Sequence, residues 1–257
     1  MGIDIQPIIK IKFAKWCLQV IKKFMFIFVK IVFPDIDSSK HSIIIPQASY
    51  SPWLLDENFK EVLGKTKNFT KLDEYRMYEL WRMVEQIKKI DGDIIQIGTW
   101  RGGSGCLLAK KAQLEKISCT VYLCDTFEGV VKAGEKDEFY KGGEHADTSK
   151  ELVEKLTKEL SLDNIKILKG IFPDETSYLI TDCNFSFCHI DVDSYASAKD
   201  ILDWIWDKMT IHGIIVFDDY GDFVAGGITD LVNEEAKKHD RIMIHNLNGH
   251  AIMIKIK

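Results

Sequence analysis

Short apolar segments alternate with longer mixed segments along the chain from residue 93 to residue 255. The apolar segments DIIQIG, CTVYLCD, IKILKG, NFSFCHID and GIIVFDD have the length and composition of strands in a buried sheet. The segments between them include GSGCLLAKKAQLEK and SAKDILDWIWDKM, which are predicted to be helices. This alternation predicts a doubly wound α/β sheet with mostly parallel strands.

Two further predicted strands, RIMIHNL and HAIMIKI, close the chain. Asn248 and Gly249 join them, and this pair is typical of a tight hairpin turn. The whole prediction is a seven-stranded sheet with a C-terminal antiparallel hairpin, preceded by an N-terminal helical extension. We expect residues 1–34 to form a basic amphipathic helix, residues 35–70 a connector and cap, and residues 71–257 the α/β domain.

Charge is unevenly distributed along the 257 residues, whose formal net charge is −5. Residues 1–33 hold six lysines and one aspartate and so contribute +5, which leaves −5 minus +5, or −10, for the remainder. An acidic body argues against nucleic acid as the main partner.

The basic segment between Pro7 and Pro34 has a wide apolar side. At about 100° per residue, five of its lysines fall within an arc of about 100° of a helix, and they would spoil a helix that crosses a bilayer. Two interpretations stay open. Residues 7–33 could lie in a membrane surface with their lysines facing anionic headgroups, or they could pack on the domain or on a partner subunit of a homo-oligomer. The expected location is the cytoplasm, and the first interpretation adds peripheral contact at the inner face of the membrane.

A glycine-rich loop, QIGTWRGGSG, follows the first predicted strand at residues 96–105. Its glycines let a ligand approach the backbone, and the next helix offers free N–H groups at its start. The second strand ends in Asp125, which is suited to accept hydrogen bonds from ribose hydroxyls. The alternative is that the glycines only make a tight turn and that Asp125 caps the segment TFEG that follows it. Together these features favour an adenosine-containing cofactor, although the G-x-G-x-x-G fingerprint is absent.

Two acidic motifs, HIDVDSY and FDDYG, stand at the ends of two apolar strands. They contain Asp191, Asp193, Asp218 and Asp219. Two carboxylates about 4 Å apart repel each other by roughly 4 kcal/mol at an effective dielectric constant near 20, and a cation removes that penalty. Carboxylate oxygens select Mg²⁺, Mn²⁺ or Ca²⁺. If only one of the two motifs were present, its aspartates would be interpreted as helix-cap or turn residues.

The loop QIGTWRGGS, the segment CDTFEG and the stretch from HIDVDSY to FDDYG resemble the macrocin O-methyltransferase family over about residues 70–257. The resemblance implies a class I, Rossmann-like methyltransferase fold that uses S-adenosylmethionine and Mg²⁺ (or Mn²⁺). It also implies methyl transfer to a sugar hydroxyl of a glycan, glycolipid or glycosylated metabolite. The alternatives are a catechol-type O-methyltransferase acting on an aromatic diol, and a non-catalytic, membrane-associated module that retains the fold.

The resemblance also implies roles for individual residues. Asp193 would be the catalytic base, and Asp191, Asp218 and Asp219 would hold the metal. The cofactor-binding residues would be Gln96, Gly98, Trp100, Arg101, Gly102, Gly103, Ser104 and Asp125. Gln96 stands where the family usually has glutamate. By their positions beside these motifs or in a predicted loop, three further residues are candidates for acceptor contact: His145, Tyr195 and Tyr220.

Overall fold

The computed structural model describes residues 6–45 and 48–257. The chain forms two compact units, Met1–Tyr50 and Ser51–Lys257, and each is described by itself. Within the described part of the first unit, the one helix is α1 (Gln6–Val32). No helix among the described residues is long and apolar enough to cross a membrane.

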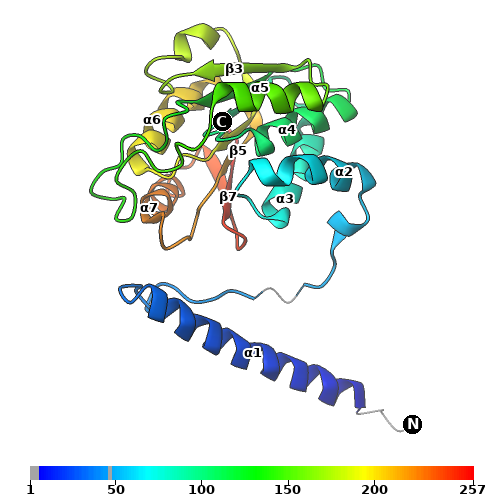
Figure 1. Ribbon diagram of the computed structural model, residues 1–257, viewed down its shortest axis with the longest axis vertical. Helices are drawn as coiled ribbons and strands as arrows, with labels where there is room; N and C mark the ends of the chain where they lie inside the picture. Colours follow the sequence, from blue (N-terminus) through cyan, green and yellow to red (C-terminus); the bar gives the residue numbers. More distant parts are fainter. Residues whose placement is uncertain (1–5, 46–47) are drawn as a thin grey trace. The chain divides into compact units, whose positions relative to one another are not determined.

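The second unit is built on a sheet with the strand order β3-β2-β1-β4-β5-β7-β6. Figure 1 labels β3, β5 and β7 of this sheet. Its seven strands are β1 (Asp93–Ile97), β2 (Val121–Asp125), β3 (Ile165–Lys169), β4 (Phe185–Ile190), β5 (Met209–Phe217), β6 (Arg241–Asn246) and β7 (His250–Lys255). Strands β1 to β5 are parallel, whereas β7 runs antiparallel to both β5 and β6. The predicted mostly parallel seven-stranded sheet with a C-terminal antiparallel hairpin is confirmed.

Helices cover both faces of the sheet (Figure 1). One face packs against α2 (Glu57–Thr66), α3 (Glu74–Gln86), α4 (Gly103–Leu114) and α5 (Lys150–Glu159), and the other against α6 (Tyr195–Ile205) and α7 (Gly226–Glu235). Short 3₁₀ turns occur at Pro52–Leu54, Lys67–Phe69, Ile87–Lys89, Ser177–Ile180 and Trp206–Lys208.

The compact unit begins at Ser51 rather than at residue 71, because α2 belongs to its core. Phe59 is fully buried, and its ring meets the rings of Tyr78 and Trp81 at centroid distances of 4.9 and 5.8 Å. Asp56 caps α2 and also accepts a 3.0 Å hydrogen bond from the Trp81 indole. Residues 51–70 therefore pack with the second unit, and the expected domain boundary at residue 71 moves to Ser51.

Strand β1 lies between β2 and β4, so the sheet changes its winding direction beside β1. In doubly wound sheets, ligands bind at such a point, outside the carboxyl ends of the strands. Gly98 follows β1 there with φ of +84°, and an added Cβ would stand 1.6 Å from the Asp191 carbonyl oxygen. Only glycine lets the loops after β1 and β4 approach each other this closely.

We expect Gly98→Ala to lower the free energy of unfolding by at least about 2 kcal/mol, since it adds both a steric clash and a strained φ. Gly134→Ala is the matched control because an added Cβ there meets nothing within 4 Å. Its effect should stay within about 1 kcal/mol. Urea denaturation of both variants measures the difference, and equal stabilities would contradict the close approach at Gly98.

Candidate active site

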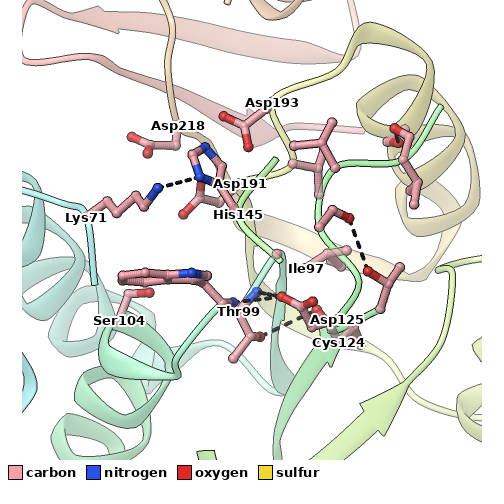
Figure 2. A pocket seen from close by; sticks show the side chains of 18 of the residues that line it. Lys71, Ile97, Thr99, Ser104, Cys124, Asp125, His145, Asp191, Asp193 and Asp218 are labelled. Carbon is pink, nitrogen blue, oxygen red and sulfur yellow. Dashed lines mark hydrogen bonds between the residues drawn. The ribbon is translucent and has the colours of Figure 1, made fainter. Parts of the chain in front are cut away.

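A pocket opens at the carboxyl ends of β1, β2, β4 and β5. Figure 2 shows the side chains of Asp191, Asp193 and Asp218 on one side of it and Asp125 on the other. The predicted site residues among its lining are Gly98, Trp100, Ser104, Asp125, His145, Asp191, Asp193, Asp218 and Asp219. The glycine loop and both acidic motifs thus face one cavity.

Asp125 holds the loop after β1 in place. One of its carboxylate oxygens accepts hydrogen bonds from the backbone N–H groups of Thr99 and Trp100, and the other from Phe127, all at 2.7 Å. Burial raises the pKa of Asp125, and these three bonds partly oppose that effect. A carboxylate has about four lone-pair sites, so Asp125 retains room for about one further hydrogen-bond donor.

Gln96 supports the same loop from inside the protein and does not line the pocket. Its side chain is fully buried, and its Nε2 donates to the Gly98 carbonyl at 3.0 Å and to Ser104 Oγ at 2.7 Å. A carboxylate could not donate to that carbonyl, which gives a physical reason for an amide here. Gln96 Oε1 is buried and accepts no hydrogen bond from the described residues.

Arg101, Gly102 and Gly103 also lie outside the pocket lining. Arg101 binds Asp147 and stacks on Trp100, with its guanidinium carbon 4.5 Å from the ring centroid. An added Cβ at Gly103 would stand 2.6 Å from the Phe69 carbonyl oxygen. These residues shape the loop by packing. From the motif alone, such packing residues cannot be told apart from residues that contact a ligand.

Asp191, Asp218 and Asp219 each offer a carboxylate oxygen, and the three oxygens lie within 4.8 Å of one another. They converge because β4 and β5 are neighbouring parallel strands, with Ile190 paired to Phe217. Burial and the charges of Asp218 and Asp219 raise the pKa of Asp191 well above its usual range. Burial followed by the charges of Asp218 and Asp193 does the same to Asp219. An all-oxygen cluster under this repulsion fits a hard divalent cation.

Asp193 lines the pocket but lies outside this trio of oxygens. Neither Asp191 nor Asp193 is a strand residue, because β4 ends at Ile190. Asp193 instead has φ of +61° in the turn before α6. Tyr140 lines the same pocket, and burial followed by the charge of the Asp193 carboxylate raises the pKa of Tyr140.

Arg76 of α3 supplies a positive charge that the sequence motifs did not indicate. Its Nη1 lies 2.7 and 2.9 Å from the two carboxylate oxygens of Asp218 and 3.8 Å from Asp219. Its Nε donates to Asp73, the N-cap of α3, at 3.1 Å. Arg76 thus offsets part of the negative charge that the four pocket aspartates carry when they are ionised.

A buried histidine supports Asp218 from the other side. His250 Nδ1 lies 2.5 Å from Glu79 Oε2, and His250 Nε2 lies 3.2 Å from Asp218 Oδ1, without the alignment of a good hydrogen bond. Burial alone would lower the pKa of His250, but Asp218 and Glu79 raise it overall. Burial alone would raise the pKa of Asp218, but His250 and Arg76 lower it overall. Asp218 is therefore held as an oriented carboxylate.

Of the three candidates for acceptor contact, only His145 lines the pocket. Its Nδ1 contacts Lys71 Nζ, and both side chains reach the pocket beside Asp191 (Figure 2). The Tyr195 hydroxyl instead donates a 2.6 Å hydrogen bond to Glu234 Oε2. The Tyr220 hydroxyl oxygen lies 3.1 Å from His245 Nδ1. These two tyrosines are close to the acidic motifs in sequence, but the helix and turn direct their side chains elsewhere.

A loop over residues 126–149 has no helix or strand and covers part of the pocket. It contributes Thr126, Gly129, Val130, Val131, Tyr140 and His145 to the lining. Structureless connections of this length in compact domains are usually functional. In the sequence, the length of this connection was the feature that could have indicated Tyr140 as a pocket residue.

The sequence model of the macrocin-O-methyltransferase (TylF) family matches residues 65–246. This chain belongs to that family. The predicted family is thus confirmed, and the match contains both acidic motifs and the glycine loop.

Two relatives of the TylF-family chain come from Streptomyces. Demethyldecarbamoylnovobiocin O-methyltransferase of Streptomyces niveus is 25% identical over 177 residues, which are 64% of this chain and 66% of the relative. The 8-demethyl-8-(2,3-dimethoxy-alpha-L-rhamnosyl)-tetracenomycin-C 4'-O-methyltransferase of Streptomyces olivaceus is 26% identical over 143 residues, 51% of this chain and 54% of the relative. The chain thus spans between about half and two thirds of these relatives' lengths.

The solved structure of the O-methyltransferase NovP has the same fold as this TylF-family chain. The TM-score is 0.64 at 22% sequence identity, and the similarity covers 74% of this chain and 83% of that one. The class I methyltransferase architecture is therefore confirmed.

We expect the full chain to bind Mn²⁺ and Mg²⁺, and the Asp191→Asn variant to lose more than about 100-fold in Mn²⁺ affinity because a ligand is removed. Glu79→Gln should weaken binding about 10-fold to 100-fold by loosening His250 behind Asp218. Asp230→Asn, on the exposed face of α7, is the control and should match the unaltered chain. Titration calorimetry measures all three, and unaltered affinity in Asp191→Asn would remove the carboxylate trio as the site.

Proposed function

We propose that this protein is an O-methyltransferase that moves the methyl group of S-adenosylmethionine to a sugar hydroxyl with the help of a divalent cation. The trio of carboxylate oxygens within 4.8 Å, in the same pocket as the glycine loop, is the observation that carries the proposal. Membership of the TylF family and the rhamnosyl acceptor in the name of the Streptomyces olivaceus relative support it.

The cofactor would lie between the loop after β1 and the end of β2. Asp125 has room for about one ribose hydroxyl, and Trp100 and Ser104 line the wall beside it. Gln96 would act from behind the loop, since its amide holds the Gly98 carbonyl and Ser104 Oγ in place. This arrangement favours the adenosine and amino-acid parts of S-adenosylmethionine.

The cation would be held by Asp191, Asp218 and Asp219. A bound Mg²⁺ or Mn²⁺ lowers the pKa of an alcohol and fixes its orientation. Arg76 and His250 keep Asp218 ionised and oriented for this task. The chemistry of the donors fits the cation, since all three supply carboxylate oxygen.

Residues of the chain would take the proton from the acceptor hydroxyl and exclude water from the pocket. Asp193 lines the same pocket as Tyr140, whose pKa its carboxylate helps to raise. Asp193 would accept the acceptor hydroxyl's proton as that oxygen attacks the methyl carbon in line with the departing sulfur. The 126–149 loop, which carries Tyr140, would cover the reacting groups.

The first test is calorimetric titration of the full chain with S-adenosylmethionine, followed by turnover with Mg²⁺ and nucleotide-linked rhamnose or catechol as acceptors. We expect the chain to bind S-adenosylmethionine in the titration. We then expect turnover of the rhamnose compound and loss of that turnover when a chelator removes the Mg²⁺. Absence of cofactor binding would sink the enzyme proposal and leave a non-catalytic module. Turnover of catechol alone would reject the sugar acceptor.

Asp193→Asn should lower kcat by about 10²-fold to 10⁴-fold, the usual contribution of a general base, while the Kd for S-adenosylmethionine stays unchanged. Asp230→Asn is again the matched control because its side chain is exposed on α7. Steady-state kinetics beside calorimetry separates the two effects. A kcat like that of the unaltered enzyme would show that Asp193 is not the base.

A further inference from the structure

Helix α1 combines a uniform positive charge with an apolar surface. Its charged residues are all lysines, and it contains no acidic residue. Several of its large apolar side chains are exposed, from 62% for Trp16 to 72% for Ile31. The methyltransferase reaction proposed above needs none of these features.

The two kinds of residue occupy different sides of α1. At 100° per residue, Lys12, Lys15, Lys22, Lys23 and Lys30 fall within an arc of about 100°. A separate arc of about 120° contains the most exposed apolar side chains, which are Phe13, Trp16, Phe24, Phe28 and Ile31. A partner must therefore be apolar toward one side of the helix and anionic toward the other.

The charge of α1 distinguishes among three possible partners of this helix surface: a second copy of the chain, the bilayer interior and a bilayer surface. In a second copy of the chain, the facing helix would carry the same lysines and no acidic residue to pair with them. A span across the bilayer would bury those lysines, and no described helix is apolar enough for it. A bilayer surface that contains anionic lipid offers both an apolar layer and a layer of negative headgroups.

We propose that α1 lies in the plane of an anionic lipid surface, with its aromatic arc in the acyl boundary and its lysines at the headgroups. Trp16 and the phenylalanines suit this depth, since amphipathic interfacial helices commonly bury Trp and Phe there. The proposal is independent of the reaction, because it concerns residues outside the pocket.

Sedimentation of the full chain with lipid vesicles tests the proposal. We expect binding to vesicles of mixed phosphatidylcholine and phosphatidylglycerol, weakening as salt rises, and much weaker binding to phosphatidylcholine alone. Changing Lys12, Lys22 and Lys23 to glutamine should weaken binding to the mixed vesicles about 100-fold, at roughly fivefold per lysine. Equal binding to both vesicle types would overturn the anionic part of the proposal.

Changing Lys155, Lys158 and Lys237 to glutamine is the matched control, since it removes the same charge from exposed positions of the second unit. Its vesicle affinity should stay within about twofold of the unaltered chain. An equal loss in this control would show that total charge, and not α1, drives binding.

Changing Phe24 and Phe28 to serine should release the chain from mixed vesicles while its melting temperature stays unchanged. Analytical ultracentrifugation of the same variant addresses the rival occupant. No vesicle binding by the unaltered chain, together with an oligomer that this variant dissociates, would overturn the proposal in favour of a second copy.

Discussion

Repulsion among the carboxylates at the ends of β4 and β5 is the constraint on which the pocket depends. Two such charges about 4 Å apart repel by roughly 4 kcal/mol at an effective dielectric constant near 20. The protein meets this cost only in part, through Arg76 and the Glu79–His250 pair. Arg76 and Glu79 both lie on α3, which packs against α4. The packing of this helix therefore places Arg76 beside Asp218 and Glu79 beside His250.

The sheet and the meeting of the acidic motifs could be predicted from sequence, because parallel strands bring their carboxyl ends to a common edge. Arg76 could not, since 142 positions separate it from Asp218 and no local pattern records such a contact. The same holds for Glu79 and His250, 171 positions apart. Tyr195 and Tyr220 show the opposite error, since closeness in sequence did not fix where their side chains point.

Gln96 illustrates how a residue behind the pocket lining can position the residues that form it. Its amide ties the Gly98 carbonyl to Ser104, while Asp125 binds the backbone of Thr99 and Trp100. The loop after β1 is thus fixed from two neighbouring strands before any cofactor arrives. Such preorganisation limits the conformational entropy that a ligand must overcome on binding.

The proposed lipid contact of α1 would also affect the proposed reaction, because α1 and the second unit belong to one chain. A methyltransferase held at a bilayer through α1 would stay near that surface and would not sample the whole cell volume. Its effective concentration toward lipid-linked acceptors would rise, while freely diffusing acceptors would gain nothing. Attachment would therefore select substrates by where they reside, before the pocket selects them by shape.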